Sequence, residues 1–203
     1  MTGIRISGGT AKGRKIDYKK TSSRGEDRLR PTSSKVREAI FDILRDRIIG
    51  STFVDLYAGS GGVGIEALSR GAGCTVFVET NPLRIKIIEQ LIDEFGFKDR
   101  ARIRRSKAYD FLEKEARKGV SFDIIFLDPP YQSKELMKVL PFIGKNRLLK
   151  PDGILIAEHF SKRTLPEVIE GLRMVKSYRY GDTSLTLYRL GDEYENSYIS
   201  RHL

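Results

Sequence analysis

Apolar and polar positions alternate in blocks along this chain, and the blocks predict a repeating order of strands and helices. Short runs rich in β-branched and aromatic residues are typical of buried parallel strands. Between them, apolar residues recur three and four positions apart, which predicts amphipathic helices. The predicted strands are Thr52–Leu56, Cys74–Glu79, Ala101–Arg104, Phe122–Leu127 and Gly153–Glu158. The predicted helices between them are Gly62–Arg70, Pro82–Gly96, Ala108–Lys118 and Ser133–Asn146.

Strands and helices that alternate at this spacing form βαβ units, which build a parallel sheet covered by helices. A further helix is expected to begin after Pro31 and to run to about Ile49, before Gly50. Near the C-terminus, Met174–Arg179 and Ser184–Leu190 predict an antiparallel pair at one edge of the sheet. The sequence therefore predicts an α/β fold with a mostly parallel sheet of seven strands.

The two ends of the chain differ from this core. Residues 3–8 and 13–18 are expected to form a short hairpin, and residues 19–30 have no apolar period, which indicates a charged loop. We therefore divide the 203 residues into a basic N-terminal extension (1–31), one α/β domain (32–190) and a polar tail (191–203). An apolar content of 39% is enough for one sizeable core.

The net charge of +10 is concentrated near the N-terminus. Residues 1–37 contain eleven Lys and Arg against three Asp and Glu, a balance of +8. A basic arm of this kind usually contacts phosphates, so Arg5, Arg14, Lys19 and Lys20 are candidate nucleic-acid contacts. The alternative interpretation is a solvated charged face.

Other features of the composition limit where the protein acts. No apolar stretch approaches the ~20 residues needed to cross a bilayer, and we find no signal peptide. The single cysteine, Cys74, cannot form an internal disulfide. With two histidines and one cysteine, we expect no transition-metal site. We therefore expect a cytoplasmic protein with no membrane partner, and we take a monomer as the default, because the sequence carries no signal of oligomeric state.

A glycine-rich segment follows the first predicted core strand: Asp55-Leu56-Tyr57-Ala58-Gly59-Ser60-Gly61-Gly62-Val63-Gly64. Glycines at this spacing let the backbone turn tightly and approach a ligand where a helix begins. Both a dinucleotide and S-adenosylmethionine suit such a turn. Asp55 favours S-adenosylmethionine, because a carboxylate attracts an amino-acid ammonium and repels a phosphate. Glu79 ends the next strand, where an acid can bind the ribose hydroxyls of either cofactor.

The most informative motif is Asp128-Pro129-Pro130-Tyr131, which follows an apolar strand. Two prolines end the strand and place an acid and an aromatic ring at the sheet edge where ligands bind. The Asp128 carboxylate and the Pro129 carbonyl can accept hydrogen bonds from an exocyclic amine and direct its lone pair toward a methyl donor. Tyr131 can stack on the base, a contact worth ~1–3 kcal/mol. This pattern predicts a methyltransferase acting on a base that is unpaired or flipped out.

Together these motifs resemble the RsmD family of bacterial 16S ribosomal RNA guanine-N2 methyltransferases. The resemblance rests on Arg5-Ile6-Ser7-Gly8-Gly9, Gly13-Arg14, Leu29-Arg30-Pro31-Thr32, Val36-Arg37-Glu38-Ala39, the glycine segment, Asp128-Pro129-Pro130-Tyr131 and Tyr180-Gly181-Asp182-Thr183.

The resemblance implies a doubly wound, mostly parallel, seven-stranded Rossmann-like methyltransferase sheet with a small N-terminal β-hairpin extension, and S-adenosyl-L-methionine as cofactor. The implied partner is 16S rRNA in an assembled or assembling small ribosomal subunit. Cofactor-binding residues implied by the match are Tyr57, Gly59, Gly61, Ala108 and Asp128. Arg30 and Thr32 would lie near the cofactor or the base.

One position departs from the family pattern. Such enzymes commonly carry an Asp before the Ala that lies beside the adenine, whereas this chain has Lys107 before Ala108. The carboxylate contact to the adenine amine would be missing, although the Ala108 amide can still donate to a ring nitrogen. Asp110 lies two residues too late for a simple replacement.

Several alternatives remain open at this point. N6-adenine methylation of DNA or RNA would use the same acceptors. A glutamine-N5 protein methyltransferase usually has Asn at the place of Asp128 and has no need of a basic arm. A non-catalytic RNA-binding assembly factor is supported only by Lys107. His159 lies at a strand end, and we interpret it as a polar strand terminus rather than as part of the pocket rim.

Overall fold

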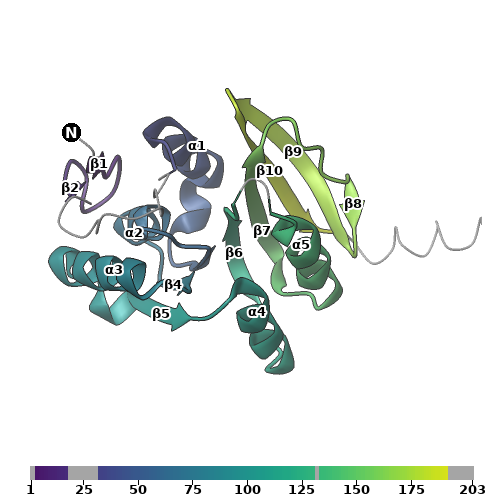
Figure 1. The fold of residues 1–203 in the computed structure, drawn as a ribbon, viewed down its shortest axis with the longest axis horizontal. Coiled ribbons are helices and arrows are strands. Elements are labelled where there is room, and N and C mark those ends of the chain that lie inside the picture. The colour runs from purple at the N-terminus through teal and green to yellow at the C-terminus, as the bar shows by residue number, and fades with distance from the viewer. Residues whose placement is uncertain (1–2, 18–31, 131–132, 192–203) are drawn as a thin grey trace, which may run out of the picture.

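The computed structural model describes residues 3–17, 32–130 and 133–191. Its main body is a twisted sheet with helices on both faces (Figure 1). In the described residues this sheet has eight strands in the order β5-β4-β3-β6-β7-β10-β9-β8. Their bounds are β3 (Thr52–Leu56), β4 (Cys74–Glu79), β5 (Ala101–Arg105), β6 (Phe122–Leu127), β7 (Leu149–Phe160), β8 (Val168–Ile169), β9 (Leu172–Tyr180) and β10 (Thr183–Leu190).

The prediction of a mostly parallel, doubly wound sheet is confirmed, but the strand count was one too low. Strands β5, β4, β3, β6 and β7 are parallel, and β10, β9 and β8 extend them as an antiparallel set. The predicted C-terminal pair is β9 and β10, yet β10 lies between β7 and β9 rather than at the edge. The edge strand β8 has only two residues, too few to produce an alternating pattern.

The helices divide between the two faces of the sheet. They are α1 (Ser34–Leu44), α2 (Gly62–Ser69), α3 (Pro82–Phe95), α4 (Ala108–Arg117) and α5 (Glu135–Lys145). Apolar residues of α4 and α5 share one core cluster with one side of the sheet. Helices α1, α2 and α3 supply apolar residues to two clusters that include residues of the other side. Both faces of the parallel strands are therefore buried, which explains their continuous apolar runs.

Two element boundaries in the α/β domain differ from the predicted ones by more than two residues, each for a local reason. Strand β7 begins four residues earlier than predicted, at Leu149, because an irregular register around Lys150–Gly153 hides it from the apolar pattern. Helix α1 ends at Leu44, and a 3-10 turn over Arg45–Ile48 replaces its predicted last turn. Its beginning is fixed by Ser33, whose hydroxyl accepts a 3.2 Å hydrogen bond from the Val36 amide.

The N-terminal hairpin, β1 (Gly3–Arg5) and β2 (Lys15–Asp17), is joined to the main body by one buried carboxylate. Glu66, in the middle of α2, is fully buried. It accepts hydrogen bonds from the Ser7 amide at 3.0 Å and the Gly8 amide at 2.8 Å. The guanidinium groups of Arg37 and Arg70 donate to the same carboxylate at 3.2 and 2.9 Å. One side chain thus connects α1, α2 and the hairpin.

Close backbone contact seals this junction. The Thr10 amide donates to the Ser69 carbonyl at 2.8 Å. A Cβ atom on Gly9 would lie 1.8 Å from that carbonyl oxygen, and Gly9 also has a φ of +75°. A glycine is therefore needed here both for space and for backbone conformation.

Replacing Glu66 with Ala should destabilise the protein by roughly 3–5 kcal/mol, because it leaves the Arg37 charge buried without its partner. Denaturant unfolding measures this change. The matched control is Glu113→Ala, which breaks the exposed pair with Arg117 and should cost no more than about 1 kcal/mol. Equal losses in the two variants would contradict the central role of Glu66.

Candidate active site

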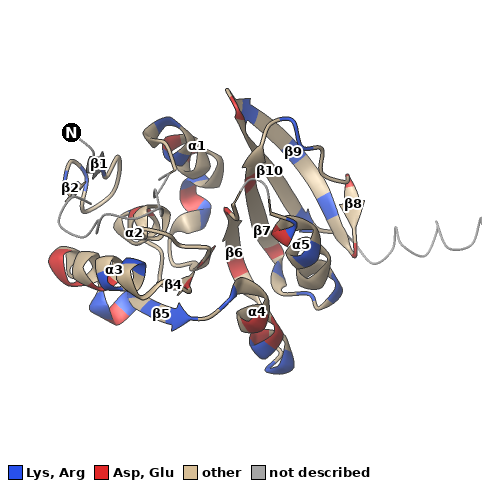
Figure 2. Cartoon of the chain, in the orientation of Figure 1, with Lys and Arg blue, Asp and Glu red and all other residues tan. Residues whose placement is uncertain are grey.

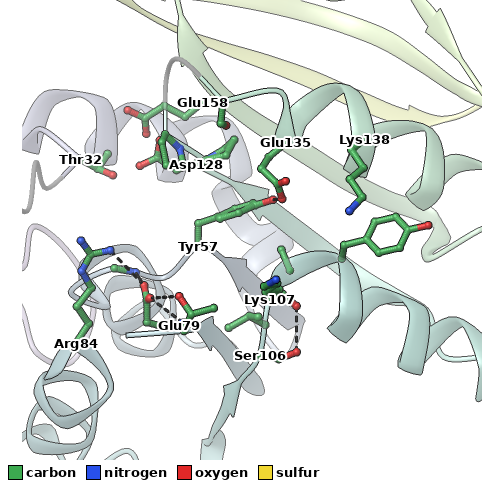
Figure 3. A pocket seen from close by; sticks show the side chains of 18 of the residues that line it. Thr32, Tyr57, Glu79, Arg84, Ser106, Lys107, Asp128, Glu135, Lys138 and Glu158 are labelled. Carbon is green, nitrogen blue, oxygen red and sulfur yellow. Dashed lines mark hydrogen bonds and ion pairs between the residues drawn. The ribbon is translucent and has the colours of Figure 1, made fainter. Parts of the chain in front are cut away.

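A cavity of about 920 Å³ opens at the carboxyl ends of the parallel strands (Figure 3). Residues at or just after the ends of all five parallel strands line it. They are Tyr57 and Gly59 after β3, Glu79 and Thr80 at β4, Ser106 and Lys107 after β5, Asp128, Pro129 and Pro130 after β6, and Glu158 near the end of β7. This is the edge at which open α/β sheets bind ligands.

Tyr57 and Gly59 of the predicted glycine turn line the cavity, whereas Gly61 and Gly64 are not among its lining residues. Gly59 and Gly61 have φ values of +56° and +80°, which glycine adopts without strain. A Cβ atom on Gly64 would lie 2.2 Å from the Phe77 ring, so its glycine permits close packing of α2 on β4. Tyr57 has a φ of +72°, a conformation that is strained for a non-glycine residue. Such strain often occurs in ligand-binding turns.

Asp55 lies beneath this turn rather than in the cavity wall. Its side chain is buried and accepts a 3.0 Å hydrogen bond from the Gly64 amide. Burial, opposed by the hydrogen bond from the Gly64 amide and assisted by the negative charges of Asp128 and Glu79, raises the pKa of Asp55 to about 7. The structure thus gives Asp55 the task of closing the glycine turn. Its contact with a cofactor ammonium stays a prediction.

Glu79 is held rigidly at the cavity. Its carboxylate accepts hydrogen bonds from the Thr80 amide at 2.7 Å, the Asn81 amide at 2.9 Å and the Gly59 amide at 2.9 Å. Glu79 therefore ties the glycine turn to the end of β4. The Thr80 hydroxyl also donates to this carboxylate at 3.3 Å, and the Arg84 guanidinium lies 3.8 Å from it, so a ribose hydroxyl would have to share or replace one of these contacts. The role of Glu79 in binding the ribose stays a prediction.

Asp128 and Pro129 form the wall on the other side of the cavity, as predicted. Burial raises the pKa of Asp128 to about 7, and a hydrogen bond from the Thr32 hydroxyl opposes that rise. Thr32 itself lines the cavity, in agreement with its expected place near the cofactor or base. Tyr131 and Arg30 lie outside the described residues.

The segment after β5 closes the far end of the cavity. Ser106, Lys107, Ala108, Tyr109 and Asp110 all line it. Lys107 makes no side-chain capping bond to α4, so the Ala108 amide in the first turn is a candidate donor to a ring nitrogen. Both the Lys107 cation and the nearby acid Asp110 therefore line the part of the cavity that follows β5.

Sequence reasoning missed several residues of the cavity. The Tyr57 hydroxyl donates to Glu135 on α5 at 2.9 Å, and the Lys138 ammonium lies 4.1 Å from the centre of the Tyr109 ring. No periodic signal marks these partners, because they come from distant helices. Glu158 could have been found, since it is an acid at the carboxyl end of a predicted parallel strand.

His159 does not belong to the cavity lining. One ring nitrogen lies 2.8 Å from the Thr186 hydroxyl and the other 3.0 Å from the Phe160 carbonyl oxygen. Burial lowers its pKa. These contacts support its interpretation as a polar strand terminus.

The predicted basic contacts lie away from this cavity. Arg5 donates to the Gly13 carbonyl within the hairpin at 2.7 Å. Arg14 lies over the Phe95 ring at 4.1 Å and donates to the Glu94 carbonyl at 2.8 Å. Both remain exposed, so their predicted contacts with RNA are untested. Lys19 and Lys20 lie outside the described residues.

A second basic surface was not predicted. Figure 2 shows Lys and Arg concentrated along β5, the edge strand of the sheet. Arg102, Arg104 and Arg105 are exposed there, and Lys107 follows at the cavity. The apolar pattern of a strand indicates which of its side chains are buried. It does not indicate that the strand lies at the edge of the sheet, so this basic surface was not predicted.

The sheet order, the glycine turn after β3, the acid at the end of β4 and Asp128-Pro129-Pro130 after β6 together define a class I S-adenosylmethionine-dependent methyltransferase. A family model described as Conserved hypothetical protein 95 matches residues 4–189. The chain belongs to this family, the RsmD family indicated by its motifs.

Individual relatives agree with this assignment. The "Putative rRNA methyltransferase YlbH" of Bacillus subtilis is 34% identical over 186 residues, covering 92% of this chain and 98% of that protein. "Ribosomal RNA small subunit methyltransferase D" of Escherichia coli is 31% identical over 188 residues, covering 92% and 89%. Among solved structures, "Putative methyltransferase yhhF" from Escherichia coli superposes with a TM-score of 0.80 at 28% identity, covering 93% and 98%.

No helix in the described ranges has the length and apolar character required to span a membrane.

Replacing Asp55 with Asn should stabilise the unliganded protein, and more so at pH 8.5 than at pH 5. The folded-state pKa of Asp55, about 7, lies above its ordinary 3.8, so wild-type stability falls as pH rises toward and through 7. Asn cannot ionise and escapes this loss. Its advantage should grow by at most roughly 3 kcal/mol between the two pH values, measured by denaturant unfolding.

The exposed Asp99→Asn change is the control for that experiment, because it removes a carboxylate without removing a buried charge. If the stability difference between Asp55→Asn and wild type did not change with pH, the folded-state pKa of Asp55 would not be raised to about 7.

Proposed function

We propose that this protein transfers a methyl group from S-adenosyl-L-methionine to the N2 amine of a guanine in 16S ribosomal RNA of the small subunit. The observation that carries the proposal is the shared cavity of the glycine turn and Asp128-Pro129. The register pairs Leu56 with Leu127, so the turn after β3 and the acid after β6 are neighbours. The name of the Escherichia coli relative supports the substrate class.

The residues present fit the cofactor. The backbone at Gly59 can approach the amino-acid part, Glu79 can accept from the ribose hydroxyls, and the Ala108 amide can donate to the adenine. When bound, the cofactor supplies an electrophilic methyl group on a sulfonium. The walls of the cavity have few cations for a phosphate and several carboxylates for a positively charged ligand, which favours this cofactor over a dinucleotide.

The protein's contribution to the reaction is mainly orientation. Asp128 and the Pro129 carbonyl accept the two N–H bonds of the target amine and fix the direction of its lone pair. Because the pKa of Asp128 is about 7, its carboxylate is ionised above neutrality and can then accept a proton from the methylated amine. A base enters this site only when it is unpaired or flipped out of its helix.

The alternatives make different products. One experiment separates these alternatives. Small subunits that lack the modification, or RNA extracted from them, are incubated with tritium-labelled cofactor, and the labelled nucleosides are then identified. We expect label in N2-methylguanosine. Label in adenosine alone would contradict the proposal in favour of N6-adenine methylation. Label in protein glutamine would favour a protein substrate. An assembly factor without activity would fail to bind S-adenosylmethionine in calorimetry even at millimolar concentration.

Replacing Asp128 with Ala should abolish detectable turnover and leave cofactor affinity within a few-fold of wild type, because the carboxylate contacts the base.

Wild-type turnover should rise with pH through about 7, as Asp128 ionises. Methyl transfer assays and calorimetry test both statements. If the Asp128→Ala variant turned over at a rate similar to wild type, Asp128 would not be the residue that orients the target amine.

The exposed arginines of β5 supply a second set of phosphate contacts in this proposal. Replacing Arg102, Arg104 and Arg105 together with Gln should weaken RNA binding. The slope of log K against log salt concentration should become less steep by about 0.7–0.9 for each phosphate that the variant no longer neutralises. Filter binding or anisotropy at several salt concentrations measures the slope.

The matched control neutralises three exposed cations at the C-terminal end of α4, Lys114, Arg117 and the capping residue Lys118, with the same change of net charge. Two of these have acidic partners on their own helix, Glu113 and Glu115. An identical slope change in both triple variants would show that only net charge matters and that β5 does not contact RNA.

A further inference from the structure

Two carboxylates lie side by side at one end of the cavity. Strands β6 and β7 run parallel, with Leu127 opposite Ala157. The next residue on each strand is an acid, Asp128 and Glu158, and neighbouring strands lie only ~4.8 Å apart. Both acids line the cavity. Glu158 is 3% exposed, so it is positioned by the sheet and not by a flexible loop.

The alternation of the strands directs both acids to the same side. Leu127 and Ala157 belong to the core cluster beneath α4 and α5, so the following residues face the opposite side of the sheet. Thr32, just before α1, donates a hydrogen bond to Asp128 on that side. Figure 3 shows Glu158, Asp128 and Thr32 together at one end of the cavity.

Carboxylates at a cavity wall suit a ligand that presents adjacent N–H donors. Guanine does so along its Watson–Crick edge, where the ring N1–H lies beside the N2 amine. Adenine offers an amine, but its N1 is an acceptor with a lone pair. The same two acids would therefore meet two donors on guanine and one donor plus a repelling lone pair on adenine.

We propose that Glu158 accepts a hydrogen bond from the N1–H of the target guanine while Asp128 holds the N2 amine. Glu158 is then a residue that determines base specificity. This inference rests on the proposed function and adds the choice of guanine over adenine, which Asp128-Pro129 cannot make because both bases carry an exocyclic amine. A site built to accept from an N–H group discriminates against an analogue that presents a lone pair at the same place, because two acceptors then face each other.

The test uses 2-aminopurine, which keeps the 2-amino group and has an unprotonated N1. After the methylated position has been mapped, subunits are assembled on RNA that carries either guanine or 2-aminopurine there. Initial rates of methyl transfer are then compared under identical conditions. The wild-type enzyme should methylate 2-aminopurine roughly 10–100-fold more slowly than guanine, the range expected for one base contact.

The variant Glu158→Gln shows whether this penalty comes from Glu158. A Gln carbonyl can still accept from N1–H but lacks the negative charge of Glu158, so the rate on guanine should fall. The Gln amide group can also donate to an unprotonated N1, so the rate on 2-aminopurine should not fall. The guanine preference should therefore shrink to near unity. Because both rates come from one variant, partial misfolding cancels in their ratio. The control Glu167→Gln, the same change at an exposed position, should keep the wild-type ratio.

Three outcomes would overturn the inference. The first is equal wild-type rates on both bases, and the second is that Glu158→Gln keeps the wild-type rate on each base. That second result would assign the wild-type preference to another group, such as a contact with the guanine O6. The third is a rate loss in Glu158→Gln that is equal for the two bases, as expected of a merely structural residue. Failure of the proposed function itself looks different, because wild-type enzyme would then form no N2-methylguanosine in unmodified subunits.

Discussion

The pairing of β3 with β6 is the constraint on which this molecule depends. From β3 the chain builds outward through β4 to β5, and then returns to place β6 on the other side of β3. The connections after β3 and β6 lead to opposite faces of the sheet, through α2 and α5, and leave a crevice between them. The glycine turn and Asp128 are about 70 residues apart in sequence, yet this one register makes them neighbours.

Charge is distributed unevenly around that crevice. Four acids, Asp55, Glu79, Asp128 and Glu158, lie in or directly beneath the cavity of a chain whose net charge is +10. The acids are buried near one another, and for Asp55 and Asp128 burial raises the pKa to about 7. A cationic cofactor and the N–H donors of a base are favoured inside, whereas exposed arginines on β5 favour the phosphates of RNA outside. Both preferences are expected of an enzyme that withdraws a single base from a polyanion.

A second buried carboxylate determines how the N-terminal extension sits on this framework. Helix α2 begins at the glycine turn and carries Glu66 one turn later, where it holds the hairpin and Arg37 of α1. The hairpin is thus attached to the helix that begins at the cofactor turn. Thr32, which bonds to Asp128, lies just before α1, the helix that Glu66 also holds. A single ionic cluster therefore connects the basic extension with both walls of the active site.

The sequence by itself determined the class of the protein. Continuous apolar runs located the five parallel strands within a few residues, because strands buried on both faces must be apolar throughout. Gly59, Gly61 and Asp128-Pro129 marked the ligand edge, because tight turns need particular residues. The tertiary structure decided what local patterns cannot express. In the folded chain Asp55 lies beneath the turn, and Glu158 lies beside Asp128. Glu135 and Lys138 line the cavity, and the arginines of β5 are exposed. Side-chain contacts between distant segments follow from strand order and register, and these are set by packing of the whole chain.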